Sequence, residues 1–234
     1  MKSFENSKLE NLSISHNLLK IIKTLGIYTG KEELYQKQAP QILKTLWQSA
    51  VIESTESSNR IEGVIIPESK RLKELIERKS KPENRSEQEI AGYRDVLATI
   101  HSSHTDIPFT PNIILQLHRD LFSFTTDPGG TWKSVDNTIS ETLADGSKRI
   151  RFQPVAAWQT KEAMDKLRSF YSESPVDQFL TIPAYILDFL CIHPFKDGNG
   201  RMARLLSLLL LYNTGCKVGR YISLERIVED TKDG

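Results

Sequence analysis

The sequence predicts a mostly α-helical protein that carries a single β-hairpin. Apolar residues recur three or four positions apart through most of the 234 residues, and helix start and stop signals divide these stretches. One stretch instead reads as two short extended runs around an Asp-Gly pair, as hairpins do. Apolar residues make up 38% of the chain and charged residues 26%, which is ordinary for a globular protein with one sizeable core.

The region 1–85 is predicted to be a set of N-terminal helices that packs on the core. An amphipathic helix is expected over 9–26, where a glycine ends the apolar stripe. A longer helix is expected over 42–63, and a third apolar stripe lies within 67–78. Polar residues with a proline among them then form the linker to the next region.

The region 86–225 is predicted to form the main helical domain. Ser86 and Glu89 have the spacing of a capping box at the start of a helix. Thr110 followed by Pro111 marks the start of another helix, because proline suits the first helical position.

Two strongly apolar helices and the hairpin complete this domain. The helices are expected over 182–192 and 202–212. The hairpin is expected over 138–152, with its turn at Asp145 and Gly146. The predicted fold is therefore a mostly α domain with one β-hairpin.

Charge and hydropathy exclude several classes of function. The formal net charge is +1, so no overall field draws the chain to nucleic acid or to an anionic membrane. The longest apolar stretch, 205–212, is far too short to span a bilayer, and 1–6 is polar, unlike a signal peptide. Cys191 and Cys216 have no metal-binding spacing. We therefore expect a cytoplasmic protein without membrane association or direct nucleic-acid binding.

The loop between the two apolar helices holds almost every polar group that a triphosphate needs. Gly198 and Gly200 allow backbone N–H groups to approach a ligand closely, and the loop leads into a helix N-terminus, which favours anions. Arg201 and Arg204 lie three residues apart, on the same side of that helix, and supply forked donors for phosphate oxygens.

Two further side chains of this loop suit chemistry on a bound phosphate. Asp197 places a carboxylate beside the anion, as expected if it holds a hard divalent cation such as Mg²⁺. His193 is then the group that can take a proton from an attacking hydroxyl. Taken singly, each of these residues has an ordinary structural explanation. Their combination between two apolar helices is what predicts a site.

The same residues resemble a known family signature. The run from His193 to Arg204 matches HPFxDGNGRxxR, the signature of the Fic (filamentation induced by cyclic AMP) domain family. Its residues are, in order, His193, Pro194, Phe195, Lys196, Asp197, Gly198, Asn199, Gly200, Arg201, Met202, Ala203 and Arg204. The resemblance implies a Fic-type helical domain with a hairpin flap. It also implies an enzyme that transfers AMP from Mg-ATP to a Ser, Thr or Tyr hydroxyl of a target protein.

The resemblance implies a role for each polar residue of the loop. His193 would be the general base, and Asp197 would bind a Mg²⁺ ion that bridges the α- and β-phosphates. Asn199 and the loop amides, including those of Gly198 and Gly200, would hold the α-phosphate where charge develops.

The two arginines would bind the remaining phosphates. The resemblance implies that Arg201 pairs with the β-phosphate and Arg204 with the γ-phosphate, while Phe195 points into the core. Relatives that transfer a different group typically depart from the signature at its end. Because both arginines are kept here, the resemblance favours transfer of AMP.

The predicted hairpin corresponds to a flap of the family. In related proteins the flap clamps a target segment by main-chain hydrogen bonds, which is a form of strand addition. Here the flap would be residues 136–152, with Thr138, Ile139, Ser140 and Glu141 nearest the site. An ordinary surface hairpin is the alternative.

Residues at the end of the second predicted helix resemble an inhibitory pattern of the family, in which Ser or Thr precedes Glu by four positions and Gly or Asn follows. Ser58, Glu62 and Gly63 occupy its defining positions. The resemblance implies that Glu62 pairs with Arg204 and so removes the cation that the γ-phosphate needs. In some relatives the same glutamate positions a water that removes AMP from a modified target, so both roles stay open.

Three further expectations concern the C-terminus, the alternatives and the assembly. Residues 226–234 are expected to begin a further segment that in related proteins supplies the adenine pocket, so we expect incomplete adenine contacts. The alternative functions are de-AMPylation, another nucleotidyl or phosphoryl transfer, and a non-catalytic nucleotide-binding regulatory module. The resemblance also allows a homodimer.

Overall fold

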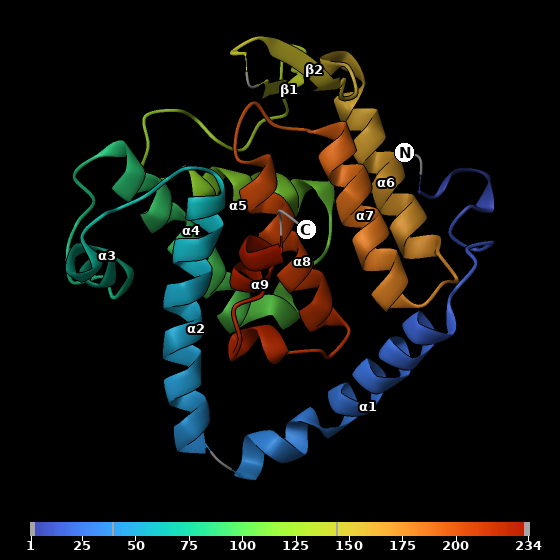
Figure 1. The fold of residues 1–234 in the computed structure, drawn as a ribbon, viewed down its shortest axis with the longest axis horizontal. Coiled ribbons are helices and arrows are strands. Elements are labelled where there is room, and N and C mark those ends of the chain that lie inside the picture. The colour runs from blue at the N-terminus through green and yellow to red at the C-terminus, as the bar shows by residue number, and fades with distance from the viewer. Residues whose placement is uncertain (1–2, 39, 144, 232–234) are drawn as a thin grey trace.

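The computed structural model describes residues 3–38, 40–143 and 145–231. This part of the chain is mostly helical, with one antiparallel two-stranded hairpin, so the predicted fold class is confirmed (Figure 1). The α-helices are α1 (His16–Gln38), α2 (Pro40–Ile61), α3 (Ser69–Ile76), α4 (Arg85–Ser103), α5 (Pro111–Leu121), α6 (Thr160–Glu173), α7 (Gln178–Ile192), α8 (Asn199–Asn213) and α9 (Leu224–Thr231). The short 3-10 helices are η1 (Glu5–Ser7), η2 (His104–Asp106), η3 (Ala157–Gln159) and η4 (Val218–Arg220), and the strands are β1 (Ile139–Thr142) and β2 (Lys148–Phe152).

Helices α7 and α8 form the centre of the fold. They pack against each other, α6 packs on α7, and α4 packs on both α5 and α8. The side chains that are fully buried here include Tyr185, Phe189, Phe195, Leu205 and Leu209. Burying one such side chain contributes about 1.5–3 kcal/mol, so this core holds both helices that flank the loop.

Helix α2 reaches the same core with polar instead of apolar side chains. It packs against α4, α8 and α9. Small polar residues with 2% of their surface or less exposed fill much of its buried face: Ser54, Thr55, Ser57, Ser58 and Asn59. Short side chains allow the end of α2 to approach α8 closely.

The predicted division into 1–85, 86–225 and 226–234 stays a prediction.

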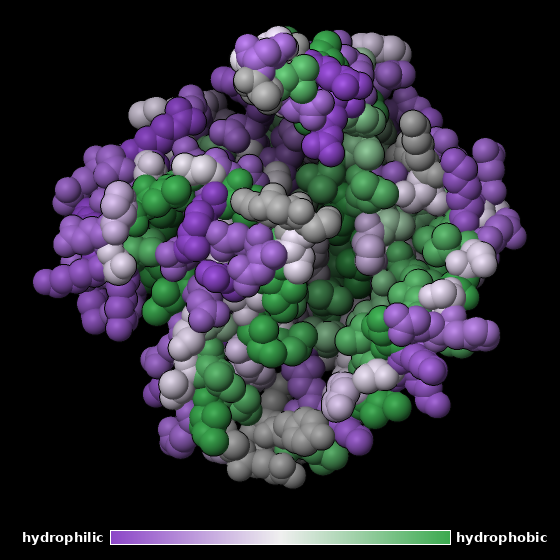
Figure 2. Space-filling model, viewed as in Figure 1, coloured by the Kyte–Doolittle hydropathy of each residue, from purple (hydrophilic) through white to green (hydrophobic). Residues whose placement is uncertain are grey.

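Helix α1 lies on the outside of the molecule, at an angle to α2 (Figure 1). Several of its apolar side chains are exposed, among them Leu19, Ile21 and Tyr28. Apolar side chains are also open in the middle of the face shown in Figure 2, and Leu187 of α7 is exposed as well. Within the described ranges, none of the helices is long and apolar enough to cross a membrane.

The first helix differs from the prediction at both ends. It begins at His16 and continues to Gln38, past Gly26, where a stop was predicted. A glycine inside a helix costs only about 1 kcal/mol relative to alanine. Gly26 has no positive φ angle, so nothing in its backbone ends the helix. A glycine is a good stop signal only where the chain turns into the left-handed region.

The capping box predicted for α4 is wrong. The helix begins at Arg85, and Asn84 is its N-cap, because the Asn84 side chain accepts a hydrogen bond from the Glu87 N–H (3.0 Å). Asparagine caps a helix as well as serine does. Capping by Asn84 instead of Ser86 leaves the carboxylate of Glu89 available for arginine partners.

Two other local predictions are confirmed. Thr110 caps α5 by accepting a hydrogen bond from the Ile113 N–H (3.3 Å), and Pro111 occupies the first turn. The hairpin predicted over 138–152 is formed by β1 and β2, with Gly146 in the left-handed region of its turn. Helix α6 was not among the predicted elements.

Because His101 and His118 are buried, we predict that the free energy of unfolding falls in mild acid. Burial lowers the pKa of His101 and of His118 to about 4. Between pH 6.5 and 4 the unfolded chain therefore takes up protons that the folded chain does not, and each histidine withdraws up to roughly 3 kcal/mol of stability. The measurement is the free energy of unfolding in urea at several pH values. His101→Gln should flatten this dependence, whereas the exposed control His16→Gln should not; equal slopes would contradict the prediction.

Candidate functional site

The loop between α7 and α8 begins and ends with a residue in the left-handed region. His193 follows α7 with φ 51° and ψ 62°, and its N–H still donates to the Phe189 carbonyl (2.9 Å). Pro194 then prevents the helix from continuing. Gly198, with φ 78°, precedes α8, and a Cβ there would come within 2.9 Å of the Phe122 ring. Backbone and packing therefore both require glycine at this position.

Asn199 closes the loop from the inside. Its Oδ1 accepts a hydrogen bond from the Phe195 N–H (3.0 Å), and its Nδ2 donates to the Phe195 carbonyl (2.8 Å). The Phe195 ring is fully buried, as predicted, and stacks on the His118 ring with 3.6 Å between centroids. Both ends of the Asn199 amide are thus engaged, and its predicted contact with an α-phosphate stays a prediction.

His118 holds the peptide of Asp197. Its Nδ1 accepts a hydrogen bond from the Gly130 N–H (2.8 Å), so its proton lies on Nε2, which donates to the Asp197 carbonyl (3.0 Å). Burial lowers the pKa of His118 to about 4, and the ring is therefore neutral at pH 7. The Asp197 carboxylate accepts from the Gly198 N–H (2.6 Å) and is 55% exposed, so it can still bind a cation.

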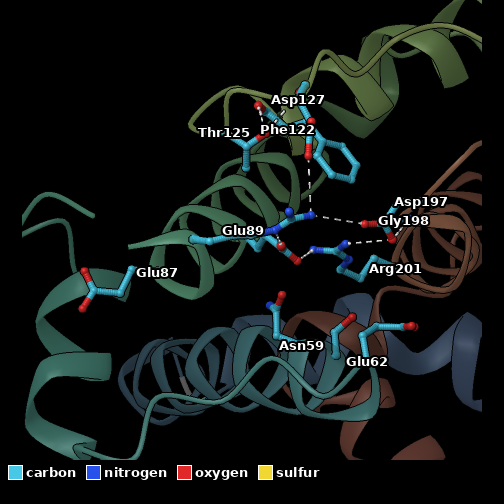
Figure 3. A network of polar contacts seen from close by, with 12 residues as sticks. Asn59, Glu62, Glu87, Glu89, Phe122, Thr125, Asp127, Asp197, Gly198 and Arg201 are labelled. Atoms are coloured by element: carbon cyan, nitrogen blue, oxygen red, sulfur yellow. Dashed lines mark hydrogen bonds and ion pairs between the residues drawn. The ribbon is translucent and has the colours of Figure 1, made fainter. Parts of the chain in front are cut away.

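Arg201 is held between the carboxylates of Glu89 and Asp197 (Figure 3). Its side chain is 2% exposed, with Nη1 2.7 Å from Glu89 Oε2 and Nη2 3.5 Å from Asp197 Oδ1. Arg85 adds a second cation, with its Nε 2.8 Å from Glu89 Oε1. Among the described residues, nothing accepts a hydrogen bond from the buried Nε of Arg201. The predicted pairing of Arg201 with a β-phosphate stays a prediction.

Arg204 binds the end of α2. Its Nε donates to Ser58 Oγ (2.8 Å), and its Nη2 donates to the Ser58 carbonyl (2.9 Å) and lies 2.7 Å from Glu62 Oε1. The Glu62 carboxylate lies against the first turn of α8, because a Cβ on Gly200 would overlap its Oε1. Gly63, with φ 79°, follows directly and turns the chain away from α8. Ser58 and Glu62 of the predicted inhibitory pattern therefore contact α8, and the inhibitory role of the pattern stays a prediction.

The His193 ring is half-buried among charged groups. Burial lowers its pKa below the ordinary value, and the cation of Lys133 lowers it further. The Leu190 carbonyl and the carboxylates of Glu62 and Asp197 oppose this shift in part. The ring is consequently neutral at pH 7, with an unprotonated nitrogen that can accept a proton.

The hairpin is tied to the loop through the segment that precedes β1. The two strands pair antiparallel, with Ile139 opposite Phe152. Asn137, two residues before β1, donates from Nδ2 to the Phe195 carbonyl (3.1 Å). The predicted role of Thr138–Glu141 in binding a target segment stays a prediction.

The Asp197 carboxylate suits a magnesium ion that is shared with phosphates. No group of three or more His, Cys, Asp and Glu side chains in the described part of the chain has a metal-binding arrangement. Asp197 is a single exposed carboxylate beside the first turn of α8. Mg²⁺ commonly takes one or two carboxylates and completes its shell with phosphate oxygens and water, so the residues fit this ion.

Four residues of this site were not predicted to belong to it. They are Glu89, which had been assigned to a cap, His118, Lys133 and Asn137. Each bonds to a residue of the loop, or of a helix end next to the loop, that lies 56 to 112 positions away in the sequence. Their one local signal is the spacing of four residues between Arg85 and Glu89, which is also common on exposed helices.

The sequence of this region matches a known family. Residues 108–211, which run from just before α5 through most of α8, match the Fic/DOC family. This segment of the chain is a Fic domain by its sequence. The matched segment contains the hairpin and the whole loop.

Other proteins are similar to this chain in sequence or in fold. A Fido domain-containing protein of Dictyostelium discoideum is 31% identical over 81 residues, which are 34% of this chain and 57% of the relative. A Fic family protein from Desulfovibrio desulfuricans G20 superposes with a TM-score of 0.74 at 17% identity, covering 95% of this chain and 65% of the other. A Fic domain containing signaling protein from Bacteroides thetaiotaomicron VPI-5482 superposes with a TM-score of 0.70 at 24% identity, covering 90% and 78%. The chain shares their fold and spans less than two thirds of the first two proteins.

The buried pair of Arg201 and Glu89 predicts a large stability loss when its charge balance is broken. Glu89→Gln keeps the shape of the side chain but leaves a buried guanidinium without its main counter-charge, so we expect a loss of about 3 kcal/mol. The control Glu83→Gln removes an exposed carboxylate and should cost less than about 0.5 kcal/mol. Urea unfolding measures both. A loss for Glu89→Gln as small as the control's would show that the pair is dispensable.

Proposed function

We propose that this chain is an autoinhibited protein adenylyltransferase, which moves AMP from Mg-ATP to a Ser, Thr or Tyr hydroxyl of a target protein. The observation that carries the proposal is the position of the Glu62 carboxylate. An anionic group already lies against the first turn of α8 and is bound by Arg204, at the place where a phosphate would be expected. Neutral His193 and exposed Asp197 stand beside it on the same loop.

The loop and the first turn of α8 supply the proposed phosphate-binding surface. N–H groups of a first helical turn have no partner within the helix, and the helix dipole favours an anion there. Gly200 lets an anionic group approach this turn closely, because a Cβ there would overlap the Oε1 of Glu62. Arg201 offers an unpaired Nε in a buried, pre-oriented guanidinium, which supports the assignment of a phosphate contact to it.

The proposed reaction uses His193 as the base. Its neutral ring accepts the proton of the target hydroxyl while the hydroxyl oxygen forms a bond to the α-phosphorus. The bond from that phosphorus to the oxygen bridging the α- and β-phosphates breaks, and pyrophosphate leaves with that electron pair. A Mg²⁺ ion held by Asp197 would neutralise phosphate charge during this exchange. General-base catalysis of this kind contributes about 10²–10⁴-fold to the rate.

The proposed inhibition is a competition for Arg204. While the guanidinium binds Glu62 and Ser58, it is not available to a γ-phosphate, and the Glu62 carboxylate repels one. Glu62 is about one third exposed and follows the last residue of α2, so it can leave without unfolding the helix. The flap residues Thr138–Glu141 would then receive the target segment next to the base.

Two alternative functions make different demands on the site. Glu62 beside the first turn of α8 is also suitably placed to orient a water for removal of AMP from a modified target. A purely regulatory nucleotide-binding module would need neither a neutral histidine at the loop nor an exposed carboxylate, so His193 and Asp197 disfavour it.

Labelling from α-³²P-ATP with Mg²⁺ tests transfer, inhibition and base together. Glu62→Gly should raise self-labelling or labelling of lysate proteins by at least about tenfold, because losing a charged hydrogen bond of about 1.5 kcal/mol or more corresponds to that factor. Adding His193→Ala should abolish labelling. Glu53→Gln, an exposed change on α2, the helix that Glu62 follows, is the matched control and should leave the wild-type level. If none of the variants transfers label while calorimetry shows that ATP binds, the transferase proposal is wrong.

The pH profile tests the state of His193. Burial lowers the pKa of folded His193 below its ordinary value of 6.5, so the midpoint at which transfer by Glu62→Gly declines on acidification should lie below pH 6.5. The decline reflects protonation of the base, which then cannot accept the proton of the hydroxyl. Circular dichroism at each pH value controls for unfolding. A midpoint above pH 6.5 in folded protein would exclude His193 as a base with a lowered pKa.

A further inference from the structure

Lys133 is a buried lysine whose ammonium group binds the end of α7. Only 6% of the surface of this residue is exposed. The Nζ donates to the Ile192 carbonyl (3.0 Å) and to Asn137 Oδ1 (2.8 Å). Among the ion pairs of the described residues, none involves Lys133. The ammonium is therefore compensated by a helix C-terminus and an amide oxygen, which is an unusual environment for a buried charge.

Lys133 and Asn137 together bind four consecutive carbonyl groups. The Lys133 ammonium donates to the Ile192 carbonyl, and the Lys133 backbone N–H donates to the Pro194 carbonyl (2.9 Å). Asn137 Nδ2 donates to the carbonyls of His193 (3.4 Å) and Phe195 (3.1 Å). The backbone on both sides of the base is thus attached to one short segment of chain.

These hydrogen bonds stabilise the left-handed backbone conformation of His193. A residue other than glycine in the left-handed region costs on the order of 1–2 kcal/mol, and such conformations persist only where surrounding contacts enforce them. Burial lowers the pKa of Lys133, and the nearby charge of Asp136 opposes this shift. Keeping the buried ammonium charged therefore costs free energy. Bonds to the carbonyls of Ile192 and His193 keep the peptide in this conformation and so determine where the imidazole points.

The same segment leads into the hairpin. Asn137 lies two residues before β1, and the intervening Thr138 is the first residue of the proposed target-binding stretch. A target segment bound along β1 would therefore be placed relative to the base through Asn137 and Lys133.

We propose that Lys133 and Asn137 are positioning residues, which hold the backbone of His193 and the start of the flap in one fixed arrangement for transfer. The inference rests on the proposed function. Neither side chain needs to touch the nucleotide or the target in this role. Losing either should loosen the loop and slow the chemical step, while ATP binding changes little.

The test uses the full chain with Glu62→Gly as the parent. Lys133→Met removes the ammonium, Lys133→Arg restores a cation, and Asn137→Ala breaks the bonds to His193 and Phe195. Lys161→Met is the matched control, because Lys161 is an exposed lysine on α6. Amide hydrogen exchange is measured for the segment 193–198 and for α4, together with kcat and the KM for ATP.

For Lys133→Met and Asn137→Ala we expect exchange of 193–198 to become at least about tenfold faster while α4 is unchanged. We expect kcat to fall by up to about 100-fold, as for a misplaced catalytic group, with KM within about threefold. Lys133→Arg should recover part of both losses, and Lys161→Met should match the parent. If Lys133→Met does not fold, Asn137→Ala decides the question, since Asn137 is only half-buried.

Two results would overturn the inference. Unchanged exchange of 193–198 would show that the pair does not hold the loop, and faster exchange with unchanged kcat would show that its role is structural only. If the Glu62→Gly parent transfers no label at all, the proposed function fails as well, and exchange alone then decides whether the pair holds the loop.

Discussion

The side chain of Asn199 hydrogen-bonds to both the backbone N–H and the backbone carbonyl of Phe195, and the shape of the loop depends on these two bonds. With the Phe195 ring anchored in the core, the chain must reverse within a few residues. It does so through left-handed conformations at His193 and Gly198. The reversal leaves the first turn of α8 uncovered by its own chain. Because that turn has unpaired N–H groups and the positive end of the helix dipole, it is the natural place for an anion.

The two arginines of α8 meet acids in different surroundings, and this difference separates a fixed contact from a releasable one. Arg201 and Glu89 are both buried, on helices that pack in the core, so neither partner can leave without exposing an uncompensated charge. Arg204 is 13% exposed and Glu62 35%, and Glu62 comes just after the end of its helix. Because the Glu62 carboxylate borders solvent, water can replace its contact with Arg204 more easily than it can replace that of the buried Glu89 with Arg201. A competing anion can therefore displace Glu62 but not Glu89.

Sequence reasoning worked where the signal was local. Thr110 with Pro111 marked a helix start, and an Asp-Gly pair marked the turn of the hairpin, because backbone preferences act over a few residues. It failed at Gly26, where helix propensity outweighed one glycine. It also failed at Glu89, where two cap assignments were locally equivalent: Asn84 caps the helix, and Glu89 pairs with a distant arginine instead.

By itself, the sequence determined the fold class, the order of groups around the loop, and the presence of a glutamate that could oppose Arg204. These follow from periodicity, backbone preferences and a long signature, all of which are read from neighbouring residues. Only the tertiary structure decided that Glu62 lies against the first turn of α8, and that His118, Lys133 and Asn137 hold the loop from outside. These contacts join residues far apart in the chain. No local preference encodes them, because packing of the helices in the core brings their backbones together.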